Sequence, residues 1–523
     1  MIQNTMGPQV GSVHSDSSDE TARPSNNELS RIESQASIAE TFSIGREILF
    51  ICVICMAQFM TQGALGNCLN LLHVIGHTFS ITNPGELSWL IAGYSLTVGS
   101  FILVSGRFGD VFGYKKMLII GFAWFSVWTM VAGLAYYSTH ILFIFARVLQ
   151  GIGPAIVLPN GLAILGATYG PGKRKAMVFC LFGACAPGGS VAAAAVAGLI
   201  VHGDPEWWPW AFYSFAMALA VITILASFVI PDPPHKVSTK NMPLSEVIAQ
   251  LDLLGAAVGV LSLVLINIAW NQAPIVGWGT PYVYTLLIIG FALTPVFFFI
   301  ELKMTSHPLI PFHALSAEVA FTLGCVACGW ACFGIWIYYT WQFFQLIRGA
   351  SPLLTAAWLS PVAVSGALAA VTTGWLLERT KPSVVMLLAL TAFTVGTVLV
   401  MTAPVEQSYW LQTFFCLLIM PWGMDMSFPA ATLILSDAVS KENQGIAASL
   451  VSTVVNYSIS LALGFAGTVE VQITTGSESP DELLKGYRAA WYVAVGLSGM
   501  GMAISALFCT RRSSHSKTRA EEK

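Results

Sequence analysis

Long apolar segments constrain the fold of this chain more than any other feature. Only 10% of the 523 residues are charged, against about 25% in an average soluble domain. A helix needs about 20 mostly apolar residues to cross the hydrocarbon of a bilayer. Fourteen segments meet this requirement, at about 47–69, 88–106, 117–136, 140–166, 176–200, 211–230, 252–271, 282–300, 316–338, 353–377, 383–403, 410–435, 445–469 and 489–509. No region shows the sustained period of two that a membrane β-barrel needs, so the fold class is an all-α membrane protein.

The positions of lysine and arginine set the orientation of these helices. With a cytoplasmic N-terminus, all of the 24 Lys and Arg residues fall in cytoplasmic segments except Arg147, Arg348, Lys485 and Arg488. Short loops that carry Lys and Arg stay on the cytoplasmic side during insertion. Both termini are therefore expected in the cytoplasm. The net charge of -3 and the lack of a basic face argue against a nucleic-acid partner.

The two ends of the chain differ from the apolar remainder. Residues 1–45 are rich in Ser, Asn and Glu, and such a composition predicts a disordered cytoplasmic tail. They lack the short apolar core that follows a basic start in a cleaved signal peptide, so the first span is expected to direct insertion. Residues 511–523 are predicted to form a cytoplasmic C-terminal tail.

Sequence patterns for enzyme chemistry are weak. Cys325, Cys328 and Cys332 share one helical face, which could suggest a metal site, but no His or acid lies nearby, so close packing is favoured. The chain has no nucleophile elbow and no phosphate-binding Gly-Lys-Ser/Thr loop. We therefore expect no enzyme activity, no metal, no cofactor and no ATP-driven step.

One polar stretch, SGRFGDVFGYKK, joins the second and third predicted spans on the cytoplasmic side. Gly106 and Gly113 allow tight turns and close backbone approach. Asp110 is placed where it could cap the positive N-terminal end of a neighbouring helix. Lys115 and Lys116 could pair with this acid or hold the loop at the lipid surface. A loop that is merely positive explains the bases but not the Gly and Asp spacing.

This spacing resembles the signature of the major facilitator superfamily, Gly-x-x-x-Asp-x-x-Gly-x-Lys/Arg-Lys/Arg, in the same loop. The resemblance implies a latch in which the acid engages a helix of the opposite half. After the tenth span, GWLLERTKP resembles a worn copy of the loop, with Gly374, Glu378, Arg379 and Lys381. Two parallel repeats are therefore expected: an N-terminal six-helix bundle at 46–230, a linker with two inserted helices at 231–312, and a C-terminal six-helix bundle at 313–510.

Two further segments resemble motifs of the same family. The fourth span reads RVLQGIGPA, and a buried arginine such as Arg147 is expected to face the bundle interior, either in a proton-coupling pathway or bonded to carbonyls between helices. The fifth span, GACAPGGSVAAAAVAG, resembles in part the helix-bend motif of drug antiporters through Pro187, Gly188 and Gly189. The alternative is a face of small residues for close helix packing.

Later segments resemble the fungal fourteen-span branch of this family, which includes drug:proton antiporters, aminotriazole or boron resistance pumps and low-affinity ammonium permeases. Drug antiporters of this type usually carry an Asp where this chain has Gln62. Asp425, within MPWGMDMSF, is the one acid that we place deep in the membrane, and it could carry a proton or belong to a permanent hydrogen-bond network. Asp252 and Glu318 lie near cytoplasmic helix ends and are expected to be interfacial or capping residues.

Polar and aromatic side chains at mid-depth are candidates to line a substrate cavity between the two bundles. Each could instead be a packing residue. They are Gln62, Asn67, Asn70, Trp89, Tyr94, Gln150, Asn160, Trp336, Tyr339, Gln342, Trp422 and Asn456, together with Asp425.

Taken together, the sequence predicts a monomeric, proton-driven secondary transporter that works by alternating access. The favoured function is export of small organic compounds, such as toxins, drugs or secondary metabolites, across the plasma membrane. A vacuolar or other internal membrane is an alternative location. The alternative function is a permease for a small polar species such as ammonium or borate.

Overall fold

The computed structural model describes residues 38–81, 83–170, 173–231, 243–305, 307–310, 317–438, 444–474 and 479–521. Within these ranges the chain forms helices joined by short connections, and 14 helices are long and apolar enough to cross a membrane. Each one overlaps a segment predicted from hydropathy. The all-α membrane fold is therefore confirmed, because in hydrocarbon a helix satisfies its backbone hydrogen bonds internally.

Six spans form the N-terminal bundle and six form the C-terminal bundle. The first contains α2 (Ile44–Asn70), α4 (Pro84–Phe112), α5 (Tyr114–Leu134), the consecutive α6 (His140–Gln150) and α7 (Ile152–Thr168), α8 (Lys173–Gly203) and α9 (Trp208–Val229). The second contains α13 (Ala317–Gln342), continued by η6 (Phe343–Ile347), then α14 (Pro352–Leu377), α15 (Pro382–Met401), α16 (Gln412–Ala438), α17 (Gln444–Ile473) and α18 (Pro480–Glu521).

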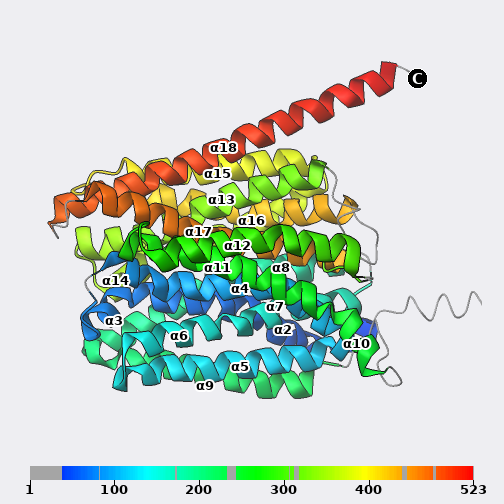
Figure 1. Ribbon diagram of the computed structural model, residues 1–523, viewed down its shortest axis with the longest axis horizontal. Helices are drawn as coiled ribbons and strands as arrows, with labels where there is room; N and C mark the ends of the chain where they lie inside the picture. Colours follow the sequence, from blue (N-terminus) through cyan, green and yellow to red (C-terminus); the bar gives the residue numbers. More distant parts are fainter. Residues whose placement is uncertain are drawn as a thin grey trace, which may run out of the picture.

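The two remaining spans lie at the periphery between the bundles. They are α11 (Leu253–Val276), preceded by the short α10 (Leu244–Leu251), and α12 (Pro281–Phe299), which ends in η4 (Ile300–Met304). Only 17% of the apolar window of α12 is buried inside the protein, against 83% for α4. Lipid must therefore cover most of α12, whereas α4 is enclosed by other helices (Figure 1).

The two bundles meet along two helix pairs that are related by the internal repeat. The second helix of the first bundle, α4, packs on the fifth helix of the second, α17. In the same way α8, the fifth helix of the first bundle, packs on α14, the second helix of the other. In both pairs the second helix of one bundle packs on the fifth helix of the other, as two parallel repeats would produce.

The repeat extends to the glycines of the two similar loops. A methyl group at Gly106 of α4 would lie 3.2 Å from Ser449 Oγ of α17, and one at Gly374 of α14 would lie 3.1 Å from Cys180 Sγ of α8. Both glycines therefore face a helix of the opposite bundle near its cytoplasmic end.

The chain ends extend the helical structure beyond the predicted limits. Residues 38–45, at the end of the predicted tail, form η1 (Ile38–Thr41) and the start of α2, and α18 continues as a helix through most of the predicted C-terminal tail. In Figure 1, α18 leaves the bundle on the same side as α10, as an even number of crossings requires. Residues 1–37 and the proline-rich boundary at 232–235 lie outside the described residues.

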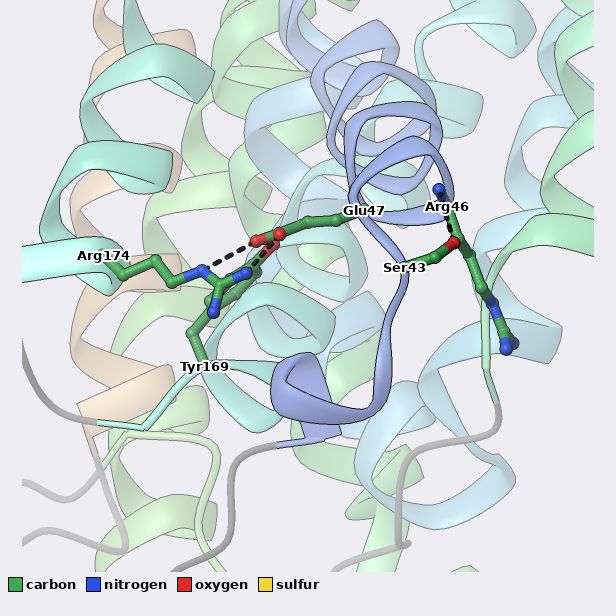
Figure 2. A network of polar contacts seen from close by, with 5 residues as sticks. All are labelled: Ser43, Arg46, Glu47, Tyr169 and Arg174. Atoms are coloured by element: carbon green, nitrogen blue, oxygen red, sulfur yellow. Dashed lines mark hydrogen bonds and ion pairs between the residues drawn. The ribbon is translucent and has the colours of Figure 1, made fainter.

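A polar network ties together the cytoplasmic end of the N-terminal bundle (Figure 2). Glu47 of α2 accepts hydrogen bonds from Arg174 of α8, at 2.8 Å from its Nε and also from its Nη2, and from the Tyr169 hydroxyl at 3.0 Å. Ser43 caps α2 by accepting from the Arg46 backbone amide. Burial and the Glu47 carboxylate raise the pKa of the Tyr169 hydroxyl, so it remains a donor. These contacts join α2 to the turn between α7 and α8.

The contact between α8 and α14 can be tested with one substitution. We expect Gly374→Cys to form a disulfide with the native Cys180 upon mild oxidation, because the added thiol would lie next to it. The linked peptides are identified by mass spectrometry. Val371→Cys is the matched control on the same helix; its side chain is 68% exposed, and it should not cross-link. A cross-link in the control alone would contradict the packing.

Candidate functional site

Most of the predicted signature loop is helical, because α4 runs through Phe112 and α5 begins at Tyr114. The expected turn at Gly106 is therefore wrong, and Gly106 instead packs against α17 of the opposite bundle. Gly113 adopts a φ of +99° between α4 and α5, a conformation that favours glycine. Asp110 accepts a hydrogen bond of 2.5 Å from the Tyr114 hydroxyl in the first turn of α5. Lys115 is half-buried and Lys116 is exposed. Gly106 thus brings this stretch close to α17, whereas engagement of the acid with the opposite half stays a prediction.

Arg107 in the same loop fixes a further segment. Its Nη2 donates to the carbonyl oxygens of His307 and Pro308, at 3.0 and 3.2 Å. These residues follow the inserted helices, and Leu309 packs with Val104 of α4. The loop therefore contacts the connection from the inserted helices as well as α17.

Arg147 is completely buried inside the N-terminal bundle. Its Nε donates to Leu90 O at 2.9 Å, its Nη1 donates to Gln150 Oε1, and its guanidinium lies 4.6 Å from the centre of the Tyr94 ring. Gln150 in turn donates to Thr129 Oγ1 at 2.6 Å. Among the described residues no carboxylate pairs with Arg147, and its Nη2 is buried without a partner. A carbonyl, an amide and an aromatic face hold this charge, and its role in proton coupling stays a prediction.

Asp425 lies where the two bundles touch. A methyl group at Gly366 of α14 would lie 2.3 Å from Pro187 Cγ of α8 and 3.0 Å from Asp425 Oδ2 of α16. Beside it, the Trp422 indole donates to Ser365 Oγ at 3.1 Å. Asp425 Oδ2 is buried and has no hydrogen-bond partner. We call Pro187, Ser365, Gly366, Trp422 and Asp425 the central junction.

The fifth-span motif contributes to this junction without breaking its helix. α8 runs unbroken from Lys173 to Gly203, and Pro187 points to α14. A methyl group at Gly189 would lie 2.1 Å from Phe59 O of α2, whereas one at Gly188 would meet nothing within 4 Å. Close packing therefore accounts for Gly189 and contact between the bundles accounts for Pro187.

Asn70 closes the outer end of the contact between the bundles. Its side chain donates to Ala194 O at 2.8 Å and accepts from the Trp341 indole at 3.3 Å. Gln345 Nε2 donates to Asn70 O at 2.9 Å. This predicted cavity residue thus joins α2 to the outer end of α13.

The other cavity candidates fall into two groups. The half-buried positions are Gln62, Trp422 and Asn456. Buried positions packed mainly within one bundle are Asn67, Trp89, Tyr94, Gln150, Asn160, Trp336, Tyr339 and Gln342. Asn160, for example, lies against Gly109 and donates to Ile156 O at 2.7 Å. A substrate role for any of them stays a prediction.

Two further acids are buried inside the protein, each near a helix end, whereas the placement of Asp425 deep in the membrane stays a prediction. Glu470 of α17 is only 4% exposed and accepts a 2.7 Å hydrogen bond from the Tyr339 hydroxyl. Glu301 is equally buried and accepts from the Ile310 amide at 3.2 Å. Asp252 caps α11 by accepting from the Gly255 amide, as predicted. Glu470 directly follows the predicted segment 445–469, and its position at the end of an apolar span was the signal that could have revealed it.

A sequence profile of the Major Facilitator Superfamily matches residues 49–462 and 319–523. The chain belongs to the major facilitator superfamily. It is 52% identical to the low affinity ammonium transporter of Saccharomyces cerevisiae over 91% of both chains. It is 44% identical to the efflux pump terJ of Aspergillus terreus, over 89% of this chain and 88% of that protein. It is also 36% identical to the aminotriazole resistance protein of S. cerevisiae, over 88% and 84% of the two chains.

Solved structures show the same fold at low sequence identity. The nucleoside transporter NupG superposes with a TM-score of 0.59 at 12% identity, over 88% of this chain and 100% of that one. A sulfate complex of the peptide transporter POT gives 0.60 at 15% identity, over 87% and 94%. The resemblance to the superfamily and to its fungal members is confirmed, and this chain is a multi-pass membrane transporter.

The tight packing of the central junction leads to a stability prediction. Gly366→Ala should destabilise the detergent-purified protein, because the new methyl group would overlap Pro187, and overpacking of this kind costs about 1–3 kcal/mol. The measurement is the thermal unfolding temperature. Gly496→Ala in α18 is the matched control, since a methyl group there meets nothing within 4 Å. Equal unfolding temperatures for the two variants would contradict the packing described for Gly366.

Proposed function

We propose that this chain is a proton-coupled exporter of small organic compounds that works by alternating access in the plasma membrane. One observation carries the proposal: Asp425 presents a buried, unpartnered carboxyl oxygen at the contact between the two bundles. The names of the relatives add support, since they include the efflux pump terJ, the aminotriazole resistance protein and the multidrug transporter mdr3.

The contacts between the bundles suggest how alternating access would proceed. Outer contacts at Asn70 and inner contacts at Gly106 and Gly374 cannot all persist while a substrate enters or leaves. Rocking of the bundles would break one set while the other holds. A protein that carries both protons and cargo then requires a proton-binding group at the central contact that is accessible from each side of the membrane in turn. Asp425 lies at this contact.

The chemistry of Asp425 suits proton exchange. A carboxylate without a counter-ion among apolar groups is costly, whereas the neutral acid is not. Opening of either face would bring water to Asp425 and allow it to ionise. Closure would favour the protonated form, so proton uptake and release are linked to the conformational cycle. The protein would act as a monomer with protons and a small molecule as its partners and with no cofactor.

A second candidate is uptake of ammonium. It is favoured by the 52% identity to the low affinity ammonium transporter, which is higher than the 44% identity to the efflux pump terJ. Gln62 in α2, where drug antiporters carry an acid, is compatible with a different cargo. The two functions differ in the direction of transport and in the size of the transported species.

Growth assays in yeast separate the two functions. If the chain is an exporter, its expression should raise tolerance to aminotriazole or another toxic compound, and a protonophore should abolish the protection. If it is an ammonium permease, it should restore growth of a strain without ammonium uptake at low external ammonium. Restored growth without any gain in tolerance would replace the export proposal.

The role of Asp425 can be measured in proteoliposomes with an imposed pH gradient. Asp425→Asn should lower proton-driven flux at least about tenfold while leaving counterflow exchange of the cargo measurable, because the amide cannot carry a proton. Asp481→Asn, an exposed acid at the start of α18, is the matched control and should keep normal flux. Unchanged proton-driven flux in Asp425→Asn would remove the assigned role.

A further inference from the structure

The inserted helices cover the seam where α4 of the first bundle meets α17 of the second. α11 contacts both of these helices, and it also packs on α12. Along α17, the Tyr457 hydroxyl donates to Leu263 O at 3.0 Å, and the Trp270 ring lies 4.4 Å from that of Phe465. At the cytoplasmic end, Arg107 of α4 holds the segment that follows α12. The inserted pair is thus attached to both halves of the transporter.

Three helices from three parts of the chain meet at Ser460 of α17. Its side chain is fully buried, and its Oγ lies 2.9 Å from Ala92 O of α4 and 3.0 Å from Asn267 Oδ1 of α11. Asn271 Nδ2 donates to Ser460 O at 3.2 Å and to Asn267 Oδ1 at 2.9 Å. A serine hydroxyl has one proton, so Ser460 can donate to Ala92 O or to Asn267 but not fully to both.

We propose that the inserted pair controls how readily the seam between α4 and α17 opens, and that Ser460 and Asn267 are the positioning residues through which it acts. With the seam closed, Ser460 donates to Ala92 O and joins the two halves. When α17 moves away from α4, Asn267 accepts the same proton, because the hydrogen bonds of Asn271 and Tyr457 hold α11 on α17. The polar hydroxyl then has a partner in both states.

The physical reason is the absence of water at this depth. A hydroxyl that loses its only acceptor in an apolar interior costs free energy, and this cost would oppose opening of the seam. Asn267 supplies the replacement acceptor and so lowers that cost. The proposal concerns the conformational equilibrium and does not depend on the identity of the cargo or on proton coupling.

The two residues should therefore have opposite effects when changed. Ser460→Ala removes the bond between the halves and should raise the population with α4 and α17 separated. Asn267→Leu removes the replacement acceptor and should lower that population. Each shift is expected to be about threefold, as for one interhelical hydrogen bond in a membrane.

The matched control is Ser262→Ala. Ser262 is also buried in α11, at 5% exposure, and its hydroxyl lies 2.8 Å from Gly290 O of α12. This substitution removes a comparable buried hydrogen bond within the inserted pair without touching the seam. It should leave the separated population unchanged even if it lowers the unfolding temperature.

Distances between genetically encoded spin labels measure the population directly in the full chain. One pair of labels, at positions 86 and 472, reports on the outer ends of α4 and α17, and a second pair, at 112 and 450, reports on the inner ends. We add the population with separated outer ends to the population with separated inner ends. Relative to the unchanged protein, this sum should be larger in Ser460→Ala and smaller in Asn267→Leu. It is overturned if both variants match Ser262→Ala or if both shift the population in the same direction.

This experiment is distinct from the test of the proposed function. Spin-label distances are measured without cargo, so they can be interpreted even if the transport assay fails. Thermal unfolding of each variant, measured in parallel, identifies any that do not fold. If either Ser460→Ala or Asn267→Leu does not fold, the other variant still decides the proposal through the sign of its shift relative to Ser262→Ala.

Discussion

Hydrocarbon offers no hydrogen-bond partners, and the whole architecture depends on this constraint. Each backbone amide and carbonyl must be satisfied inside the chain, which leaves helices as the way to cross the membrane fourteen times. The same constraint applies to side chains. A polar group between the spans must find a partner on a neighbouring helix, so the few polar contacts mark where helices from different parts of the chain meet.

Small residues and single hydrogen bonds together form the contact between the bundles. Apolar packing gives little preference for one helix arrangement in lipid, because lipid tails are as apolar as leucine. Glycines such as Gly366 and Gly374 allow close approach, and residues such as Asn70 and Ser460 add directional bonds. An interface built in this way is compatible with opening and closing, since single hydrogen bonds, and no large polar network, link the bundles within the described parts of the chain.

Buried charges are handled differently within a bundle and between bundles. Arg147 lies inside one bundle, where a carbonyl, an amide and the Tyr94 ring of that same bundle stabilise it. Asp425 lies between the bundles with an oxygen that has no partner. A group whose surroundings change during the cycle can couple a proton to movement, whereas a group with permanent partners serves stability. Glu470, bonded to Tyr339 inside the C-terminal bundle, belongs with the permanent kind in this arrangement.

Much of this protein follows from its sequence alone. The span length and the placement of Lys and Arg determined the all-α membrane fold, because hydrophobic thickness and membrane charge act on each segment separately. The signature loop at Gly106 and Asp110 and its worn copy at Gly374 determined the family and the repeat. Tertiary structure alone decided which polar residues face one another. Pro187, Gly366 and Asp425 lie far apart in sequence, and their contact depends on how three helices rotate and cross. Hydropathy carries no information on rotation within an apolar span, so the meeting of Ser460, Ala92 and Asn267 could be known only from the packed helices.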